Sequence, residues 1–394
     1  MRRAARPLHG PDDLDPLLER VGDARIVLLG EASRGTSEHN AARSMDAGVG
    51  FYGLDVYSLW ASLAEIMRYL ERVDPDALEA AREAVACFEP YGRGVQAYAH
   101  ATAFVPDSCE DEVVELLATV RRRTADLADD HEAAFDAEQN ARAAVGAERY
   151  YRAMLRADAD SWTVRDRHMV GTLEALMAHH GPDAKAIVWE HNTHIGDARA
   201  TDMAAAGMVN AGQLTRERNG RDDVLAVGFG SRRSSVIAGR YWGADFERMP
   251  VPPAQAGSWE DVFHTALAGD GPLLTGDLSE AAEERRGHRA IGVVYDPDAE
   301  RFGNYVPSRL KARYDAFVFL DATQALHPLR PEAEDGRPPD LYPWGVCGRS
   351  GAGAKAATIL DGWRSSRCCC TASSGAGTTF SSRSPCCGAS SCWR

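Results

Sequence analysis

A short apolar run that passes directly into a polar cluster constrains this chain more than any other feature. Residues Ala186 to Trp189 are apolar, and the next five residues are polar and end in His194. This pattern is typical of a buried strand that ends at the carboxyl edge of a parallel sheet, where α/β proteins bind ligands. His191 and His194 lie three residues apart, so both rings can face one site. The alternative interpretation is a polar turn whose histidines only bind backbone groups.

Similar runs occur elsewhere in the chain. The apolar residues Ile26 to Leu29 are followed by Gly30 and then Glu31, which places a second ionisable side chain at a predicted strand end. The other predicted strands are 49–55, which ends on Asp55, and 224–230, 290–295 and 316–321.

Helical periodicity dominates residues 57–178. Apolar residues recur along single helix faces, as in Leu59, Leu63, Ile66, Met67 and Leu70 and in Val113, Val114, Leu116, Leu117 and Val120. We expect Trp162, Met169, Leu173 and Leu176 to be core residues. Arg165 and His168 lie one turn apart on another stripe of the same helix, which is either solvated or part of a site. The pattern predicts a single α/β domain with a mostly parallel central sheet, helical connections and a large helical insertion.

The composition excludes several classes of function. The chain has 58 Asp and Glu against 44 Lys and Arg, a formal net charge of −14. Because no basic stripe with interleaved aromatic residues is present, we expect no nucleic-acid partner. No apolar run approaches the roughly 18 residues of a membrane span. We therefore expect no membrane association and a cytoplasmic location; the oligomeric state stays open.

The nine cysteines are unevenly distributed. Two of them, Cys87 and Cys109, lie in the first 346 residues, and the other seven fall between Cys347 and Cys392. A disulfide framework would spread its cysteines through the fold, so none is predicted. We predict one folded domain over residues 1–345 and a Cys- and Ser-rich, disordered tail over residues 346–394.

Three motifs resemble those of the erythromycin esterase-like family. Residues 30–38, Gly-Glu-Ala-Ser-Arg-Gly-Thr-Ser-Glu, are similar to the family signature Gly-Glu-x-x-His-Gly-Thr. Residues 161–169 resemble its Trp-x-x-Arg-Asp motif, and residues 189–199 resemble its Ala-His-Asn-x-His segment. The resemblance continues through 304–307 and 313–317, so it covers nearly all of the predicted domain.

The resemblance implies a hydrolase of carboxylic esters, with the opening of macrolide lactones, and hence antibiotic resistance, as the named activity. Some family members carry a polysaccharide-biosynthesis description instead. The implied reaction is attack by water, without a covalent acyl-enzyme, a cofactor or a required metal. The catalytic residues carried over from the family motifs are Glu31, His191, His194 and Arg165. The candidates for binding the substrate, a small ester or lactone, are Arg34, Asp55, His168 and Arg199.

The chain departs from the family pattern at the first motif. Arg34 stands where the family has its proposed general-base histidine, and a guanidinium, which stays protonated, cannot take a proton from water. Arg34 would instead stabilise an oxyanion or hold an anionic substrate, with His191 or Glu31 as the base. Residues 40–50 replace a longer family segment, which predicts the loss of one strand and one wall of the site. Glu190 stands where the family usually has Ala.

Three hypotheses for the function remain open. The first is a hydrolase of this family, impaired to the extent that Arg34 fails to replace the base. The second is a catalytically inactive binding protein that keeps the site for an anionic ligand. The third is a metalloprotein that uses Glu31, His191 and His194, a ligand set that zinc accepts.

Overall fold

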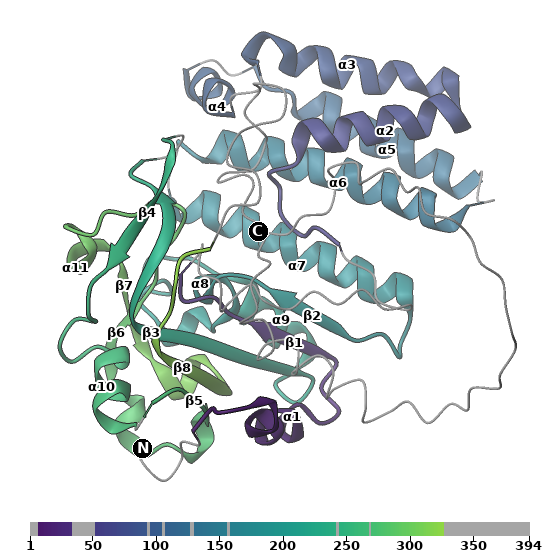
Figure 1. Cartoon of the computed structure of the whole chain (residues 1–394). Coiled ribbons are helices and arrows are strands. Elements are labelled where there is room, and N and C mark those ends of the chain that lie inside the picture. Colours follow the sequence, from purple (N-terminus) through teal and green to yellow (C-terminus); the bar gives the residue numbers. More distant parts are fainter. Residues whose placement is uncertain are drawn as a thin grey trace, which may run out of the picture.

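A six-stranded sheet forms the centre of the molecule (Figure 1). Its strands follow the order β2-β1-β3-β8-β5, and β4 pairs with the C-terminal half of β3. The pairs β2–β1, β1–β3 and β3–β8 are parallel, whereas β5 and β4 run antiparallel to their neighbours. The strands are β1 (Ile26–Leu29), β2 (Ala186–Trp189), β3 (Val224–Gly239), β4 (Phe246–Val251), β5 (Gly271–Leu274) and β8 (Ala316–Ala322). This arrangement confirms the predicted mostly parallel α/β fold.

The computed structural model describes residues 7–33, 52–92, 95–104, 107–126, 130–155, 158–241, 244–267 and 269–326. The first predicted motif from Arg34 onward, the short segment 40–50 and the tail 346–394 lie outside these ranges. The predicted domain boundaries therefore stay predictions.

Apolar side chains cover both faces of the sheet. In β1, Ile26 and Leu28 pack with α7 (Asp158–His180) and α10 (Trp259–Ala266), while the alternate residues Val27 and Leu29 pack with α1 (Asp15–Val21). A strand with helices on both faces has no solvent side, so an unbroken apolar run is what its sequence requires.

The helical insertion lies on the far side of α7 from the sheet (Figure 1). It comprises α2 (Leu59–Val73), α3 (Leu78–Phe88), α4 (Val95–Phe104), α5 (Glu110–Asp126) and α6 (His131–Ala153). These helices share a core of their own, built from Leu, Val and aromatic side chains against the alanine-rich face of α6. The predicted insertion is thus confirmed. Val114, which was predicted on the apolar face of α5, is 43% exposed.

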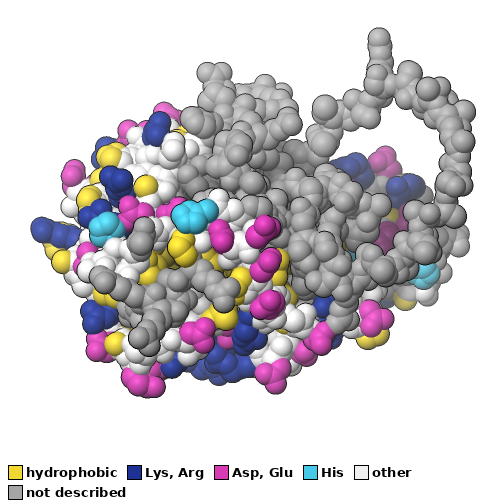
Figure 2. Space-filling model, turned by 60° about the horizontal axis from the view of Figure 1, so that its bottom comes forward, with side chains coloured by type: hydrophobic (Ala, Val, Ile, Leu, Met, Phe, Trp, Pro, Cys, Tyr) yellow, Lys and Arg dark blue, Asp and Glu magenta, His cyan; other side chains and the backbone are white. Residues whose placement is uncertain are grey.

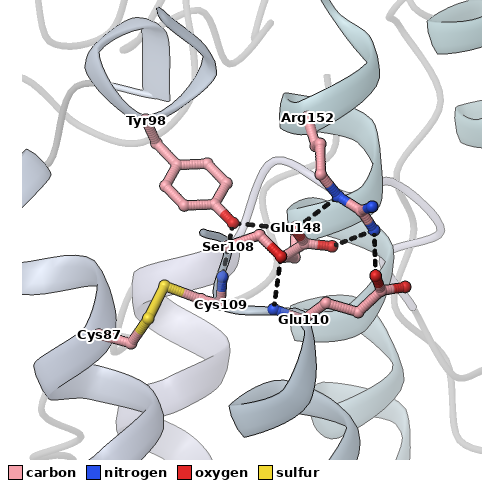
Figure 3. The surroundings of a disulfide bond; sticks show 7 residues. All are labelled: Cys87, Tyr98, Ser108, Cys109, Glu110, Glu148 and Arg152. Atoms are coloured by element: carbon pink, nitrogen blue, oxygen red, sulfur yellow. Dashed lines mark hydrogen bonds and ion pairs between the residues drawn. A yellow bond between two sulfur atoms is a disulfide. The ribbon is translucent and has the colours of Figure 1, made fainter. Parts of the chain in front are cut away.

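A disulfide between Cys87 and Cys109 joins the end of α3 to the start of α5 (Figure 3). The neighbouring Tyr98 hydroxyl accepts a hydrogen bond from the Cys109 amide (2.9 Å) and donates one to the buried Glu148 carboxylate (2.8 Å). No disulfide was predicted from the sequence, because two cysteines are not a framework. Disulfides persist mainly in oxidising compartments. The cytoplasmic location stays a prediction.

Two strand predictions were wrong within the described residues. Residues 52–55 are not in a strand; Leu54 instead packs into the core between the sheet and α7. Residues 290–295 form only isolated bridges, from Ile291 to Ser33 and from Val294 to Gly239. The strand in this region lies upstream, where β6 (Arg285–Arg289) pairs with β7 (Tyr305–Arg309) in a separate two-stranded sheet.

The remaining helical elements are short and lie between the longer helices and strands. They are η1 (Pro11–Leu14), η2 (Pro75–Ala77), η3 (Glu89–Tyr91), α8 (Asn192–Ile195), η4 (Ala198–Ala200), α9 (Ala211–Asn219), η5 (Thr275–Asp277), η6 (Glu280–Glu283), α11 (Glu300–Gly303) and α12 (Leu310–Arg313). None of the helices in the described ranges is long and apolar enough to span a bilayer. On the face drawn in Figure 2, the described Lys and Arg side chains are interspersed with Asp and Glu.

Candidate active site

The carboxyl ends of β1 and β2 bring Glu31 and His191 to the same edge of the sheet. The two strands pair in parallel up to their last residues. Beyond them, the Glu190 amide donates to the last carbonyl of β1 (3.1 Å), and the Asn192 amide donates to the Glu31 carbonyl (2.9 Å). The side chains of Glu31 and His191 are both buried. The two chain segments that carry Glu31 and the two histidines therefore run side by side at this edge.

His191 caps the N-terminus of the short helix α8. Its Nδ1 accepts a hydrogen bond from the Thr193 amide (3.3 Å) and lies 2.7 Å from the Thr193 hydroxyl. Because a backbone amide can only donate, Nδ1 is an acceptor, which assigns the proton of the neutral ring to Nε2. His191 therefore presents a donor, not an acceptor, at its second nitrogen.

The His194 ring contacts three residues of α7. Its Nδ1 lies 2.9 and 3.0 Å from the two carboxylate oxygens of Asp166, and its Nε2 lies 3.5 Å from a guanidinium nitrogen of Arg165. The Trp162 ring stacks on the imidazole, with 4.4 Å between centroids and 4° between planes. Nδ1–H donates to the carboxylate, and Nε2 faces the cation as an acceptor. The ring is thereby fixed in position and in tautomer.

Asp166 was not among the predicted site residues. It is fully buried and accepts a hydrogen bond from the Ala211 amide (2.8 Å) as well as from His194. Burial raises the pKa of Asp166 well above its ordinary value, although Arg165 and the Ala211 amide act in the opposite direction. The buried carboxyl thus binds a proton more readily than an exposed one, and the shared hydrogen bond with His194 ties the protonation of the two groups together.

Arg165 and Asp55 form a two-pronged ion pair. The Arg165 Nε and a terminal nitrogen donate to the two Asp55 oxygens at 2.8 and 2.5 Å. Burial alone would lower the pKa of Arg165, but Asp55 raises it well above the ordinary value. The guanidinium also lies over the Tyr57 ring, 5.0 Å from its centroid. A planar cation held by a carboxylate and an aromatic face is preorganised to meet negative charge.

His168 lies one turn beyond Arg165, where α7 contacts α6. A Cβ atom added to Gly146 of α6 would lie 2.5 Å from His168 Nδ1, so the close approach of the two helices requires glycine there. Burial lowers the pKa of His168 to about 4, so the ring is neutral near pH 7. A role in substrate binding stays a prediction.

The other predicted binding residues lie apart or outside the described ranges. Arg199 forms ion pairs with Asp197 (2.8 Å) and Glu217 (3.2 Å), and its side chain is 48% exposed. Its predicted contact with substrate stays a prediction, as does that of Arg34, which lies outside the described residues.

The sequence analysis missed part of the site. Trp162 was expected in the core, but it is only half-buried, and its ring stacks on His194. Asn192, between the two histidines, is fully buried and hydrogen-bonds β3. Both Asp166 and Asn192 could have been found from their place in the sequence motifs. Asp166 directly follows Arg165 in the helical motif, and Asn192 lies between the two histidines.

The zinc hypothesis gains no support from the described residues. Within these ranges, no group of three or more His, Cys, Asp or Glu side chains is arranged to hold a metal ion. His194 Nε2 faces the Arg165 guanidinium, which is an unfavourable neighbour for a cation.

Known proteins resemble this chain in fold. A crystal structure of a protein from Bacillus cereus superimposes with a TM-score of 0.63 at 16% identity, over 82% of this chain and 96% of that one. A succinoglycan biosynthesis protein gives the same values. A mutant of the erythromycin esterase EreC in its open conformation superimposes with a TM-score of 0.60 at 15% identity, over 79% of this chain and 94% of that one.

A sequence comparison extends this likeness beyond the fold. The sequence model of the erythromycin esterase family matches residues 37–323. This range includes the helix with Arg165 and Asp166 and the turn with His191 and His194, whereas Glu31 and Arg34 precede it. The chain therefore belongs to the erythromycin esterase family.

Proposed function

We propose that this chain hydrolyses a small carboxylic ester or lactone by direct attack of water. Family membership supports a hydrolase. The observation that carries the proposal is the setting of His194, with Asp166 at 2.9 Å, Arg165 at 3.5 Å and Trp162 stacked on the ring. An imidazole that a carboxylate orients can hold the neighbouring cation in place to stabilise the negative charge that develops on the ester oxygen. Macrolide lactones are the first substrates to test, given the name of the family.

The geometry favours a division of roles among the four predicted catalytic residues. His191 Nδ1 accepts from the Thr193 amide, so its Nε2–H is a donor and Glu31 is the better candidate for the base. In this scheme Glu31 takes the proton of the attacking water as the C–O bond forms. Arg165 and His191 Nε2–H stabilise the tetrahedral oxyanion, and His194 holds Arg165 in place. The ester C–O bond then breaks, and the leaving oxygen takes the proton back from Glu31.

Arg34 supports a second candidate function. It occupies the motif position of the family's proposed base, and it adds a cation to a chain that already has Arg165 at the predicted site. A protein that binds a small anion without chemistry is therefore the alternative. Restoring histidine at position 34 separates the two, because only an impaired hydrolase gains activity from it.

The test is mass spectrometry of a macrolide lactone and a simple aryl ester after incubation with four purified proteins. These are the unaltered chain, Arg34→His, His191→Ala and Glu31→Gln. Hydrolysis by the unaltered chain that disappears in Glu31→Gln supports Glu31 as the base. Hydrolysis that appears only with Arg34→His identifies a family hydrolase disabled at one residue. If all four proteins are folded and none hydrolyses either ester, the proposal fails for these ester classes and anion binding is measured instead.

A further inference from the structure

A second histidine–carboxylate pair lies fully buried near the proposed site. Glu260 of α10 and His288 of β6 are both inaccessible to solvent, and Glu260 Oε1 lies 2.5 Å from His288 Nδ1. The same oxygen accepts the Arg289 amide (3.0 Å). Burial lowers the pKa of His288; burial alone would raise that of Glu260, but His288 and Arg289 lower it. The pair is thus a carboxylate and a neutral imidazole with its proton on Nδ1.

The second nitrogen of His288 faces Asn192. With the proton on Nδ1, Nε2 is an acceptor, and the Asn192 side-chain amide donates to it over 3.3 Å. That amide also donates to the Phe229 carbonyl (2.6 Å) and accepts from the Phe229 amide (3.1 Å). Its orientation is therefore fixed by three partners. A Cβ atom at Gly30 would lie 2.0 Å from Asn192 Oδ1, so glycine at the end of β1 makes room for this side chain.

The main chain of Asn192 is held by a buried cation. Arg313 is fully buried and donates to the Asn192 carbonyl (3.1 Å) and to the Ser308 hydroxyl (2.5 Å). The peptide that carries this carbonyl also carries the Thr193 amide, which donates to His191 Nδ1. A cation that binds the carbonyl polarises the peptide and strengthens its N–H as a donor. Arg313 is thus connected to the ring of His191 through one peptide unit.

We propose that Glu260, His288 and Arg313 are positioning residues that act through Asn192 to fix the turn bearing His191 and His194. Glu260 sets the tautomer of His288, His288 fixes the Asn192 side chain, and Arg313 keeps the His191 proton on Nε2. The expected effect of these residues on kcat rests on the proposed function. Their effect on the position and tautomer of the histidines does not. Residues that orient a metal-ligating histidine from behind typically contribute about 10- to 100-fold to metal affinity or activity, and we expect an effect of the same order for a histidine without a metal.

Glu300 provides a matched control for Glu260. It is also a buried carboxylate in the same polar cluster, but it binds the Arg289 guanidinium (2.5 Å) and not His288. Glu260→Gln and Glu300→Gln therefore each remove one carboxylate from similar surroundings. Only Glu260→Gln changes a residue that contacts His288, which in turn contacts Asn192.

The primary experiment is NMR of the histidine ring nitrogens in protein labelled with 15N-histidine. We expect the signals of His288 and of His191 or His194 to change in Glu260→Gln and to stay in place in Glu300→Gln. Exposed His100 serves as the internal reference. If the two variants give the same spectrum at the site histidines, the proposal is overturned. This measurement needs no substrate, so it stands even if no ester is hydrolysed.

The kinetic experiment uses whichever protein hydrolyses an ester, the unaltered chain or Arg34→His. We expect Glu260→Gln to lower kcat by about 10- to 100-fold, with KM changed by less than about 3-fold. Glu300→Gln should leave both nearly unchanged in protein that is folded.

If Glu260→Gln does not fold, Arg313 gives a second comparison. Arg313→Lys keeps a charged donor, and it should shift the His191 ring signals less than Arg313→Gln does. Equal shifts in the two variants would contradict a role for the charge at Asn192.

Discussion

The sheet half and the helical insertion of this molecule bury different kinds of side chain. At the sheet edge, Asp166, Glu260, His288, Arg289 and Arg313 are all at most 1% exposed. Within the described parts of α2–α6, by contrast, Glu148 is the one buried charged side chain, and it is satisfied by Tyr98 and Arg152. The core of the insertion is apolar and aromatic, with one disulfide.

This difference indicates that the insertion stabilises the fold, whereas the buried polar groups at the sheet edge orient side chains of the candidate site. Burying a charge costs free energy that its partners only partly return, so a cluster of such groups is a poor way to stabilise a fold. Each of these groups instead has partners that fix its orientation. Apolar packing and a cross-link stabilise without orienting any reactive group. We therefore expect substitutions at the sheet edge to change activity, and substitutions in the insertion to change the free energy of unfolding.

The largest effect is expected at His194. In a protein that hydrolyses an ester, His194→Ala should lower kcat by roughly 10²- to 10³-fold, because Arg165, which stabilises the oxyanion, loses the neighbour that holds it in place. The measurement is steady-state kinetics beside circular dichroism. His100→Ala, on the exposed side of α4, is the control and should leave kcat unchanged. Full activity in folded His194→Ala would remove this residue from the proposed mechanism.

Phe88 tests the other side of the comparison. It is 2% exposed, and its ring packs 5.1 Å from Tyr98 and 6.4 Å from Trp60. Phe88→Ala should lower the free energy of unfolding by about 3–5 kcal/mol, through lost burial and the cavity left behind. Urea unfolding measures the loss. Activity per folded molecule should persist; a drop in kcat without a loss of stability would contradict the separation of roles.

The disulfide should contribute somewhat less. Replacing both Cys87 and Cys109 by Ser opens a closed loop with a sequence separation of 22 residues, and we expect a loss of about 2–4 kcal/mol. Peptide mapping of the unreduced chain first checks that the bond forms. Reduction of the unaltered chain should reproduce the effect of the double variant. Two free thiols at these positions in freshly purified protein would contradict a contribution of this bond to stability.

The lowered pKa of His168 leads us to expect that the free energy of unfolding depends on pH. Its pKa is about 4 in the folded chain and near 6.5 when unfolded, so the unfolded state binds the proton first as the pH falls. The contribution of its neutral form is complete above pH 6.5 and is lost between pH 6.5 and about 4. The loss is up to about 3 kcal/mol, reduced by the partial exposure of the ring. Unfolding free energies of the unaltered chain and His168→Gln should differ in slope only across this window.

Arg199 should show the smallest effect. The Arg199 side chain is itself half-exposed, and the buried Asp197 keeps Arg216 as a second cation, so Arg199→Gln is expected to cost about 0.2–1 kcal/mol. Thermal unfolding at low and high salt measures this cost, which should shrink with salt. A marked rise in KM in the same variant would instead assign Arg199 to substrate binding.

Strands could be predicted from the sequence where both of their faces are covered by other parts of the protein. In β1, β2, β8 and residues 224–230 of β3 the apolar runs reflect helices or other core on both faces, and these segments were predicted. The rest of β3, which begins with Ser231, Arg232 and Arg233, was not predicted. The strands β4, β6 and β7 carry Arg, Glu, His or Ser at many positions, and β5 contains Pro272. Such sequences do not mark strands by themselves. Pro272 is tolerated because β5 is an edge strand, and the buried His288 and Arg289 of β6 are tolerated because carboxylates meet them.

The residues Glu31, His191 and His194 could be chosen from the sequence because each directly follows or lies near the end of an apolar run. The motif resemblance added Arg165 and named the family, which the comparison then confirmed. These are local properties: the period of the apolar residues, the glycine that ends a run and the polar cluster behind it. They set the fold class and the edge of the sheet at which the site forms.

Only the tertiary structure shows which distant side chains contact one another. His194 meets Asp166 across 28 residues, Asn192 meets His288 across 96, and Arg313 reaches the Asn192 carbonyl across 121. The tautomers of His191 and His194, the neutral state of His168 and the Cys87–Cys109 bond all depend on such contacts. Proton position and pKa depend on the atoms within a few ångströms of a group, and chain folding alone determines which distant residues supply those atoms.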